Sequence, residues 1–135
     1  PPFHDAEQSK KNLEMIKVWS DLGFEGATSG NAIPVKEPRL SIGTGGYSGP
    51  PLFSYTIDAI KQIQKIVPSS NFEINSVGGI SKPSDIRQAL DQGAKTVQLL
   101  TSLVFDGPSV IQRLLKGMSE PRETSTGLAK IGVNI

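Results

Sequence analysis

Residues 72–118 read FEINSVGGISKPSDIRQALDQGAKTVQLLTSLVFDGPSVIQRLLKGM, and this stretch decides the fold. Two runs of apolar and β-branched residues, 72–77 and 96–100, each precede a segment with apolar residues at helical spacing. Pro83 suits the first turn of the helix after the first run, and Pro108 opens the last helix. Strands that alternate with helices predict parallel βα units, because a parallel pairing needs a crossover helix.

The sequence upstream continues the same alternation. Asp5 followed by Gln8 has the form of a helix capping box. The segments that we predict there are a helix over 6–22, a strand over 24–29, a Gly- and Pro-rich loop over 30–51 and an isoleucine-rich helix that Pro68 ends. Loops as long as this one are usually functional or disordered.

The composition excludes several classes of protein. The chain has 135 residues, 36% apolar and 20% charged, which is typical of a folded domain. It is well short of the roughly 250 residues of a complete (β/α)8 barrel. A net charge of +1 without a basic block argues against a nucleic-acid partner. The chain has no cysteine, and His4 is its single histidine, so we expect no metal site; His4 itself is expected at the surface.

Two neighbouring strand ends predict a phosphate site. Gly78 and Gly79 end one strand, and Thr101 and Ser102 end the next. In (β/α)8 barrels the loops after the last two strands commonly bind phosphate through backbone N–H groups and hydroxyls. The alternative is that Gly78-Gly79 is only a tight strand-to-helix turn.

A second glycine-rich segment, GTGGYSG at 43–49, has two interpretations. It fails the dinucleotide fingerprint, since the third glycine would fall on Ser48, and it lacks the lysine of a P-loop. It could be a flexible linker. Its position before a helical unit favours a loop whose backbone approaches a flat cofactor.

These motifs resemble those of the dihydroorotate dehydrogenase family. Residues 44–52, TGGYSGPPL, resemble the family's Thr-Gly-Gly-Leu-Ser-Gly-x-Pro-Leu, particularly in its quinone-linked class. SVGGI at 76–80 is similar to the end of the family's strand seven, and 93–108 is similar to its strand eight and last helix. The motifs keep the family's order over 23–118. The resemblance implies an α/β fold that is the C-terminal part, about strands six to eight, of a (β/α)8 barrel.

Carried over position by position, the resemblance implies two sets of site residues. The FMN-binding residues would be Gly30, Gly49, Gly78, Gly79, Leu100 and Thr101; the substrate-binding residues would be Asn31 and Ala32. Asn31 matches the asparagine that hydrogen-bonds the orotate ring. Gly30 and Ala32 replace hydroxyl residues of the family, and Leu100 replaces a tyrosine. Contacts that use those hydroxyls are therefore in question.

The implied reaction oxidises dihydroorotate to orotate in pyrimidine synthesis, an oxidoreductase acting on a CH–CH bond. A base takes the C5 proton, a hydride passes from C6 to flavin N5, and a quinone would accept the electrons. A quinone-linked enzyme implies attachment to the mitochondrial or bacterial inner membrane, and another acceptor implies the cytoplasm. Two alternatives stay open: another FMN-dependent barrel oxidoreductase, and a flavin-free phosphate-binding half-barrel.

The domain organisation follows from the same resemblance. We predict a half-barrel over 1–118 and a polar extension over 119–135. The opening Pro1-Pro2 without an initiator methionine predicts a sequence joined in mid-chain. The family's proton-abstracting serine or cysteine would precede it, so no catalytic residue is assigned, and residues 1–135 alone should be inactive. The N-terminal half of the barrel is the expected partner.

Overall fold

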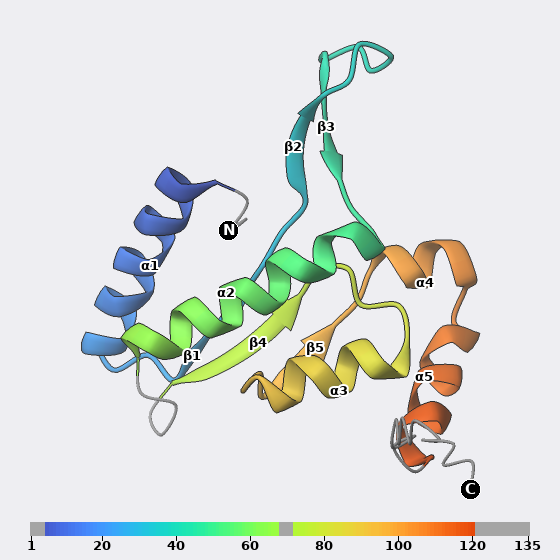
Figure 1. Cartoon of the computed structure of the whole chain (residues 1–135). Coiled ribbons are helices and arrows are strands. Elements are labelled where there is room, and N and C mark those ends of the chain that lie inside the picture. The colour runs from blue at the N-terminus through green and yellow to red at the C-terminus, as the bar shows by residue number, and fades with distance from the viewer. Residues whose placement is uncertain (1–4, 68–71, 121–135) are drawn as a thin grey trace, which may run out of the picture.

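The structure is a computed structural model that describes residues 5–67 and 72–120. A three-stranded parallel sheet lies at its centre, in the order β1-β4-β5 (Figure 1). The strands are β1 (Gly26–Ser29), β4 (Glu73–Val77) and β5 (Thr96–Gln98). The helices are α1 (Ala6–Asp21), α2 (Phe53–Ile66), α3 (Pro83–Asp91), α4 (Thr101–Asp106) and α5 (Ser109–Ser119), and a short 3-10 turn, η1 (Pro50–Leu52), precedes α2. The predicted parallel βα units are therefore present.

The main core lies between the sheet and α2. Ile57, Ile60 and Ile63 recur along one face of α2 and are all at most 4% exposed. They pack with Ile74 of β4 and Ala89 of α3. Burying a side chain of this size contributes about 1.5–3 kcal/mol, so the isoleucine face holds α2 firmly on the strands. A second cluster joins the later helices and consists of Ile80, Ile86, Val110 and Leu114.

The strands present two different faces. Side chains alternate along a strand, so Ser76 and Ile74 point toward the helices while Asn75 points to the opposite side. On that opposite side Asn75 is paired in register with Thr28 and Thr96, and the Thr96 hydroxyl donates to Asn75 Oδ1 at 2.5 Å. Because the three strands are parallel, their carboxyl ends meet at one edge of the sheet.

The predicted loop over 30–51 is wrong in part, because it contains an antiparallel hairpin. The hairpin consists of β2 (Ile33–Lys36) and β3 (Thr44–Tyr47), and it projects from the body of the molecule (Figure 1). Strand β2 carries a proline and β3 carries two glycines, residues that are usually depleted in strands. Pairing between the strands, rather than residue preference, forms this element.

The C-terminal elements also differ in detail from the prediction. Strand β5 ends at Gln98, and Thr101 begins a separate six-residue helix, α4, that was not predicted. Helix α5 runs to Ser119, one residue past the predicted boundary between half-barrel and extension. Residues 121–135 of that extension, His4 and Pro68 lie outside the described residues.

Candidate functional site

A cavity of about 140 Å³ lies at the carboxyl ends of the three strands. It is built from the segment after β1, the loop before η1, the turn after β4 and the segment after β5. The lining residues are Gly30, Asn31, Ala32, Ser48, Gly49, Leu52, Val77, Gly78, Gly79, Ile80, Leu99, Leu100 and Thr101. All eight residues assigned from the sequence are among them, although they are spread over 72 positions, from 30 to 101. Their roles toward a ligand stay predictions.

The Gly78-Gly79 turn packs directly on the start of α2. Gly79 has a φ of +73°, and a Cβ there would lie 2.3 Å from the backbone nitrogen of Phe53. Gly78 has a φ of +123°, and its Cβ would lie 2.7 Å from Thr56 Oγ1. The fold therefore requires glycine at both positions with or without a ligand, as the tight-turn alternative holds. The tight-turn alternative does not explain why the segments after β1, β4 and β5 line one cavity.

The loop before η1 and the start of α4 form another part of the cavity lining. Gly49 has a φ of +97°, and a Cβ there would meet only Thr101 Cγ2, at an ordinary 3.6 Å. The Thr101 hydroxyl donates to Ser48 Oγ at 3.2 Å. Leu100 precedes α4 and is 67% exposed, so most of its side chain lies in solvent. This part of the lining thus combines two neighbouring hydroxyls with a buried glycine.

Asn31 lies where β1 leads into the hairpin. Its Oδ1 accepts a hydrogen bond from the Ala32 N–H at 2.8 Å, and the side chain is exposed. Gly30 before it approaches β4 so closely that a Cβ would lie 1.9 Å from the Val77 carbonyl oxygen. An amide side chain can donate and accept at once, which suits the edge of a pyrimidinedione ring.

Ser102 does not take the position expected for a phosphate donor. It is buried, and its hydroxyl donates to the Ile80 carbonyl oxygen at 2.8 Å rather than lining the cavity. The sequence analysis also missed Thr56, whose hydroxyl donates to the Gly78 carbonyl oxygen at 2.9 Å. Thr56 and Ser102 share one feature that the sequence shows: each is a hydroxyl residue in the first turn of a helix. Such a hydroxyl can donate to the backbone of a neighbouring glycine turn, here the Gly78–Ile80 turn.

The charged residues of the hairpin lie away from the cavity, at the tip. Arg39 and Glu37 form an ion pair there, 2.6 Å between Nη2 and Oε2, and the hairpin carries it away from the sheet (Figure 1). The hydrogen bond from the Arg39 side chain lowers the pKa of the Glu37 carboxyl below its ordinary value. The pair fixes the conformation of the tip and takes no part in the cavity.

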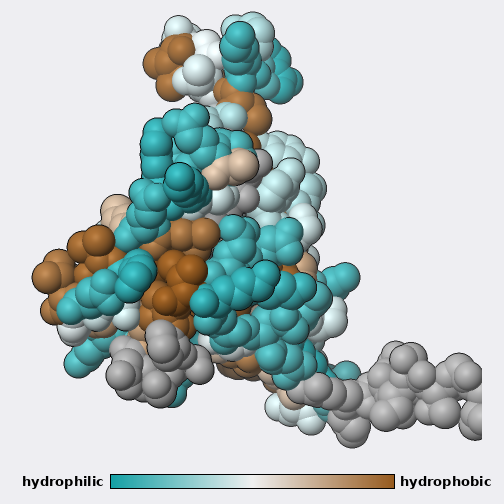
Figure 2. All heavy atoms as spheres, turned by 60° about the vertical axis from the view of Figure 1, so that its left-hand side comes forward, coloured by the Kyte–Doolittle hydropathy of each residue, from teal (hydrophilic) through white to brown (hydrophobic). Residues whose placement is uncertain are grey.

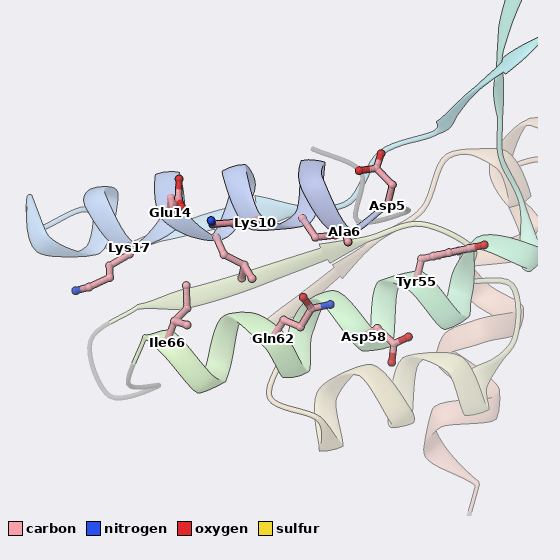
Figure 3. Close-up of a pocket in the computed structure, with 11 residues that line it drawn as sticks. Asp5, Ala6, Lys10, Glu14, Lys17, Tyr55, Asp58, Gln62 and Ile66 are labelled. Atoms are coloured by element: carbon pink, nitrogen blue, oxygen red, sulfur yellow. The ribbon is translucent and has the colours of Figure 1, made fainter.

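A larger hollow, of about 600 Å³, lies between α1 and α2 (Figure 3). Leu13 and Ile66 supply apolar surface, and Lys10, Lys17 and Asp58 are among the charged residues around it. On the α1 side of the molecule hydrophobic atoms lie open between hydrophilic ones (Figure 2). The residues that line this groove belong to α1, its N-cap Asp5 and α2, and none belongs to the strand-end turns.

Within 5–67 and 72–120, no helix combines the length and the apolar character that crossing a membrane requires. The same ranges contain no cluster of three or more His, Cys, Asp or Glu side chains placed to ligate a metal ion.

Comparison with known proteins gives one consistent family. The model of the family described as dihydroorotate dehydrogenase matches residues 4–121. A dihydroorotate dehydrogenase (quinone) from Chloroflexus aurantiacus is 32% identical over 107 residues, covering 75% of this chain and 29% of the relative. A mitochondrial dihydroorotate dehydrogenase (quinone) from Candida glabrata is 32% identical over 104 residues, covering 76% of this chain and 24% of the relative.

A solved structure supports the same fold. The crystal structure of DHODH from Eimeria tenella in complex with ferulenol superposes with a TM-score of 0.70 at 24% identity. The match covers 82% of this chain and 30% of that one. It confirms the predicted fold class, part of a (β/α)8 barrel. The chain spans about a quarter of the length of the curated relatives that it matches.

Proposed function

The chain belongs to the dihydroorotate dehydrogenase family, whose members use a flavin, and from this premise we propose that it forms the FMN- and orotate-binding end of such an enzyme. The activity would be the oxidation of dihydroorotate to orotate. One observation carries the proposal: all eight residues that match the family's flavin and substrate positions line a single cavity at the carboxyl edge of the sheet. Active sites of (β/α)8 barrels lie at this edge.

The residues present fit a phosphorylated flavin. The Gly78-Gly79 turn and Thr101 line the same cavity, so backbone groups of the turn and a hydroxyl are available to one ligand. Backbone N–H groups and hydroxyls are the donors that a phosphate accepts. Gly49 also lines the cavity, and without a side chain its backbone could lie against a flat ring. When bound, FMN would supply the hydride-accepting chemistry.

The chain's own residues would bind and orient the substrate and the flavin. Asn31 would hydrogen-bond the pyrimidine ring, with Ala32 beside it, and Thr101 would hold the phosphate. Quinone is the proposed electron acceptor, because the relatives are named for it. We propose that the protein acts at an inner membrane and that the rest of the barrel closes over the exposed face of the sheet. No residue among 1–135 is proposed as the catalytic base.

The test is flavin binding by the full-length protein with Thr101→Val. This change keeps the shape of the side chain and removes the hydroxyl. Losing one charge-assisted hydrogen bond costs about 1.5–3 kcal/mol, so FMN affinity should fall about ten- to hundredfold in a fluorescence titration. Thr44→Val, on the hairpin, is the matched control and should leave the affinity unchanged. A wild type that binds no flavin would favour the flavin-free alternative.

A further inference from the structure

We propose that Thr56 and Ser102 are positioning residues that hold the Gly78–Ile80 turn with the Gly79 N–H directed at the phosphate of a bound flavin. Neither side chain lines the cavity. Each is buried and donates to a carbonyl of the turn, from a different helix. This inference rests on the proposed function; it adds Thr56, which no motif indicated, and gives Ser102 a different role.

Thr56 controls the peptide between Gly78 and Gly79. The side chain is 4% exposed, and its Oγ1 lies 2.9 Å from the Gly78 oxygen and 3.3 Å from the Val77 oxygen. The described residues contain no cis peptide bond. In a trans peptide the C=O and the following N–H point in opposite directions. A carbonyl drawn toward Thr56 on α2 therefore turns the Gly79 N–H away from α2.

The peptide between Gly78 and Gly79 needs the hydrogen bond from Thr56 because a glycine lies on each side of it. Gly78 and Gly79 both have positive φ, and glycine tolerates either sign of φ at little cost. A peptide between two glycines can therefore flip, which would exchange its N–H for its C=O. A carbonyl oxygen in that position would repel an anion, whereas an N–H group attracts it. The hydrogen bond from Thr56 selects the attractive orientation.

Ser102 holds the other end of the turn. Its Oγ donates to the Ile80 oxygen at 2.8 Å, and the next N–H, that of Ser81, donates to Asp85 Oδ2 at 3.0 Å. The Ile80–Ser81 peptide is thus held through both of its polar groups. Asp85 is 4% exposed and also accepts from the Lys82 N–H at 3.2 Å, so the start of α3 is fixed as well. The turn can present its amides in one orientation only.

The experiment compares FMN with riboflavin, which lacks the phosphate, in the full-length protein. Thr56→Val should weaken FMN binding about tenfold and leave riboflavin binding unchanged, because only the phosphate meets the turn. Thr56→Ser keeps the hydroxyl and should restore FMN affinity. Ser102→Ala should show the same selectivity, and Ser102→Thr should restore it. Titration of flavin fluorescence measures both ligands.

Ser76→Ala is the control for loss of a buried hydroxyl. Ser76 lies on β4 just before the turn, is fully buried, and its hydroxyl has no hydrogen-bond partner within the described part of the protein. Its removal should change neither affinity. Equal weakening of FMN and riboflavin in Thr56→Val and Ser102→Ala would show general destabilisation and overturn the inference, as would unchanged FMN binding in both. A wild type that binds neither flavin would instead overturn the proposed function.

Discussion

The groove between α1 and α2 and the cavity at the strand ends differ in size and in what forms them. The groove between α1 and α2 holds about 600 Å³, and the cavity at the strand ends holds about 140 Å³. Helical side chains such as Lys10 and Lys17 surround the groove, whereas four separate backbone segments converge on the cavity. Backbone segments that converge hold their atoms in fixed positions, whereas long exposed side chains such as those of the groove can change conformation. For this reason the smaller hollow is the one that we propose as the ligand site.

The largest expected effect is on stability and comes from Gly30, which follows β1 and packs closely against β4. Gly30→Ala places a Cβ 1.9 Å from the Val77 oxygen at a φ of +112°, so we expect a loss of about 3 kcal/mol or more in unfolding free energy. Gly43→Ala is the matched control, because Gly43 has a φ of +69° with nothing within 4 Å of its Cβ, and it should cost about 1 kcal/mol. Urea denaturation of both variants measures the difference. Equal losses would mean that the strand ends are not tightly packed.

An intermediate effect is expected on substrate binding. Asn31→Ala removes an amide from the cavity wall, so orotate affinity in the full-length protein should fall about tenfold while FMN stays bound. Gln62→Ala removes an amide from the groove instead and should change neither ligand. Calorimetric titration with orotate gives the comparison. An orotate affinity indifferent to Asn31 would show that the cavity residues after β1 are assigned wrongly.

The smallest effect is expected in the groove. Lys17 is 60% exposed and pairs with Asp21 at 3.1 Å, one helical turn away. Exposed pairs of this kind contribute about 0.3–0.5 kcal/mol, so Lys17→Ala should lower the unfolding free energy by no more than that. Flavin and orotate affinities should not change. Loss of either ligand from Lys17→Ala would make the groove part of the site and remove the contrast between the hollows.

The parts of the fold that were predicted have strong local signals. Helix α2 repeats isoleucine at helical spacing, and Pro83 begins α3 as expected. The hairpin gives no such signal, since Pro34 and Gly45 are unusual in strands and the element depends on the pairing of β2 with β3. Helix α4 is too short for a helical period to stand out.

The candidate site likewise has one part that the sequence could predict and one part that it could not. The eight cavity residues were found because motifs mark the ends of strands, where backbone shape is repeated within a family. Thr56 and Ser102 act through carbonyl oxygens, and the partner of a hydroxyl cannot be read from its place in the sequence. Ser102 was accordingly assigned to the phosphate directly, although its hydroxyl faces the Ile80 carbonyl. Contacts between distant segments appear only in three dimensions.

The hairpin determines where this chain can accept inserted residues. Strand β2 begins just after Asn31 and Ala32, and β3 ends just before Ser48 and Gly49, with Ile33 opposite Tyr47. The base of the hairpin thus holds two cavity segments together, while its tip lies in solvent. Extending both strands by an even number of residues keeps each side chain on its face, and a longer tip costs little closure entropy. A peptide tag or a small sensor domain can therefore be inserted at the tip while the cavity keeps its shape.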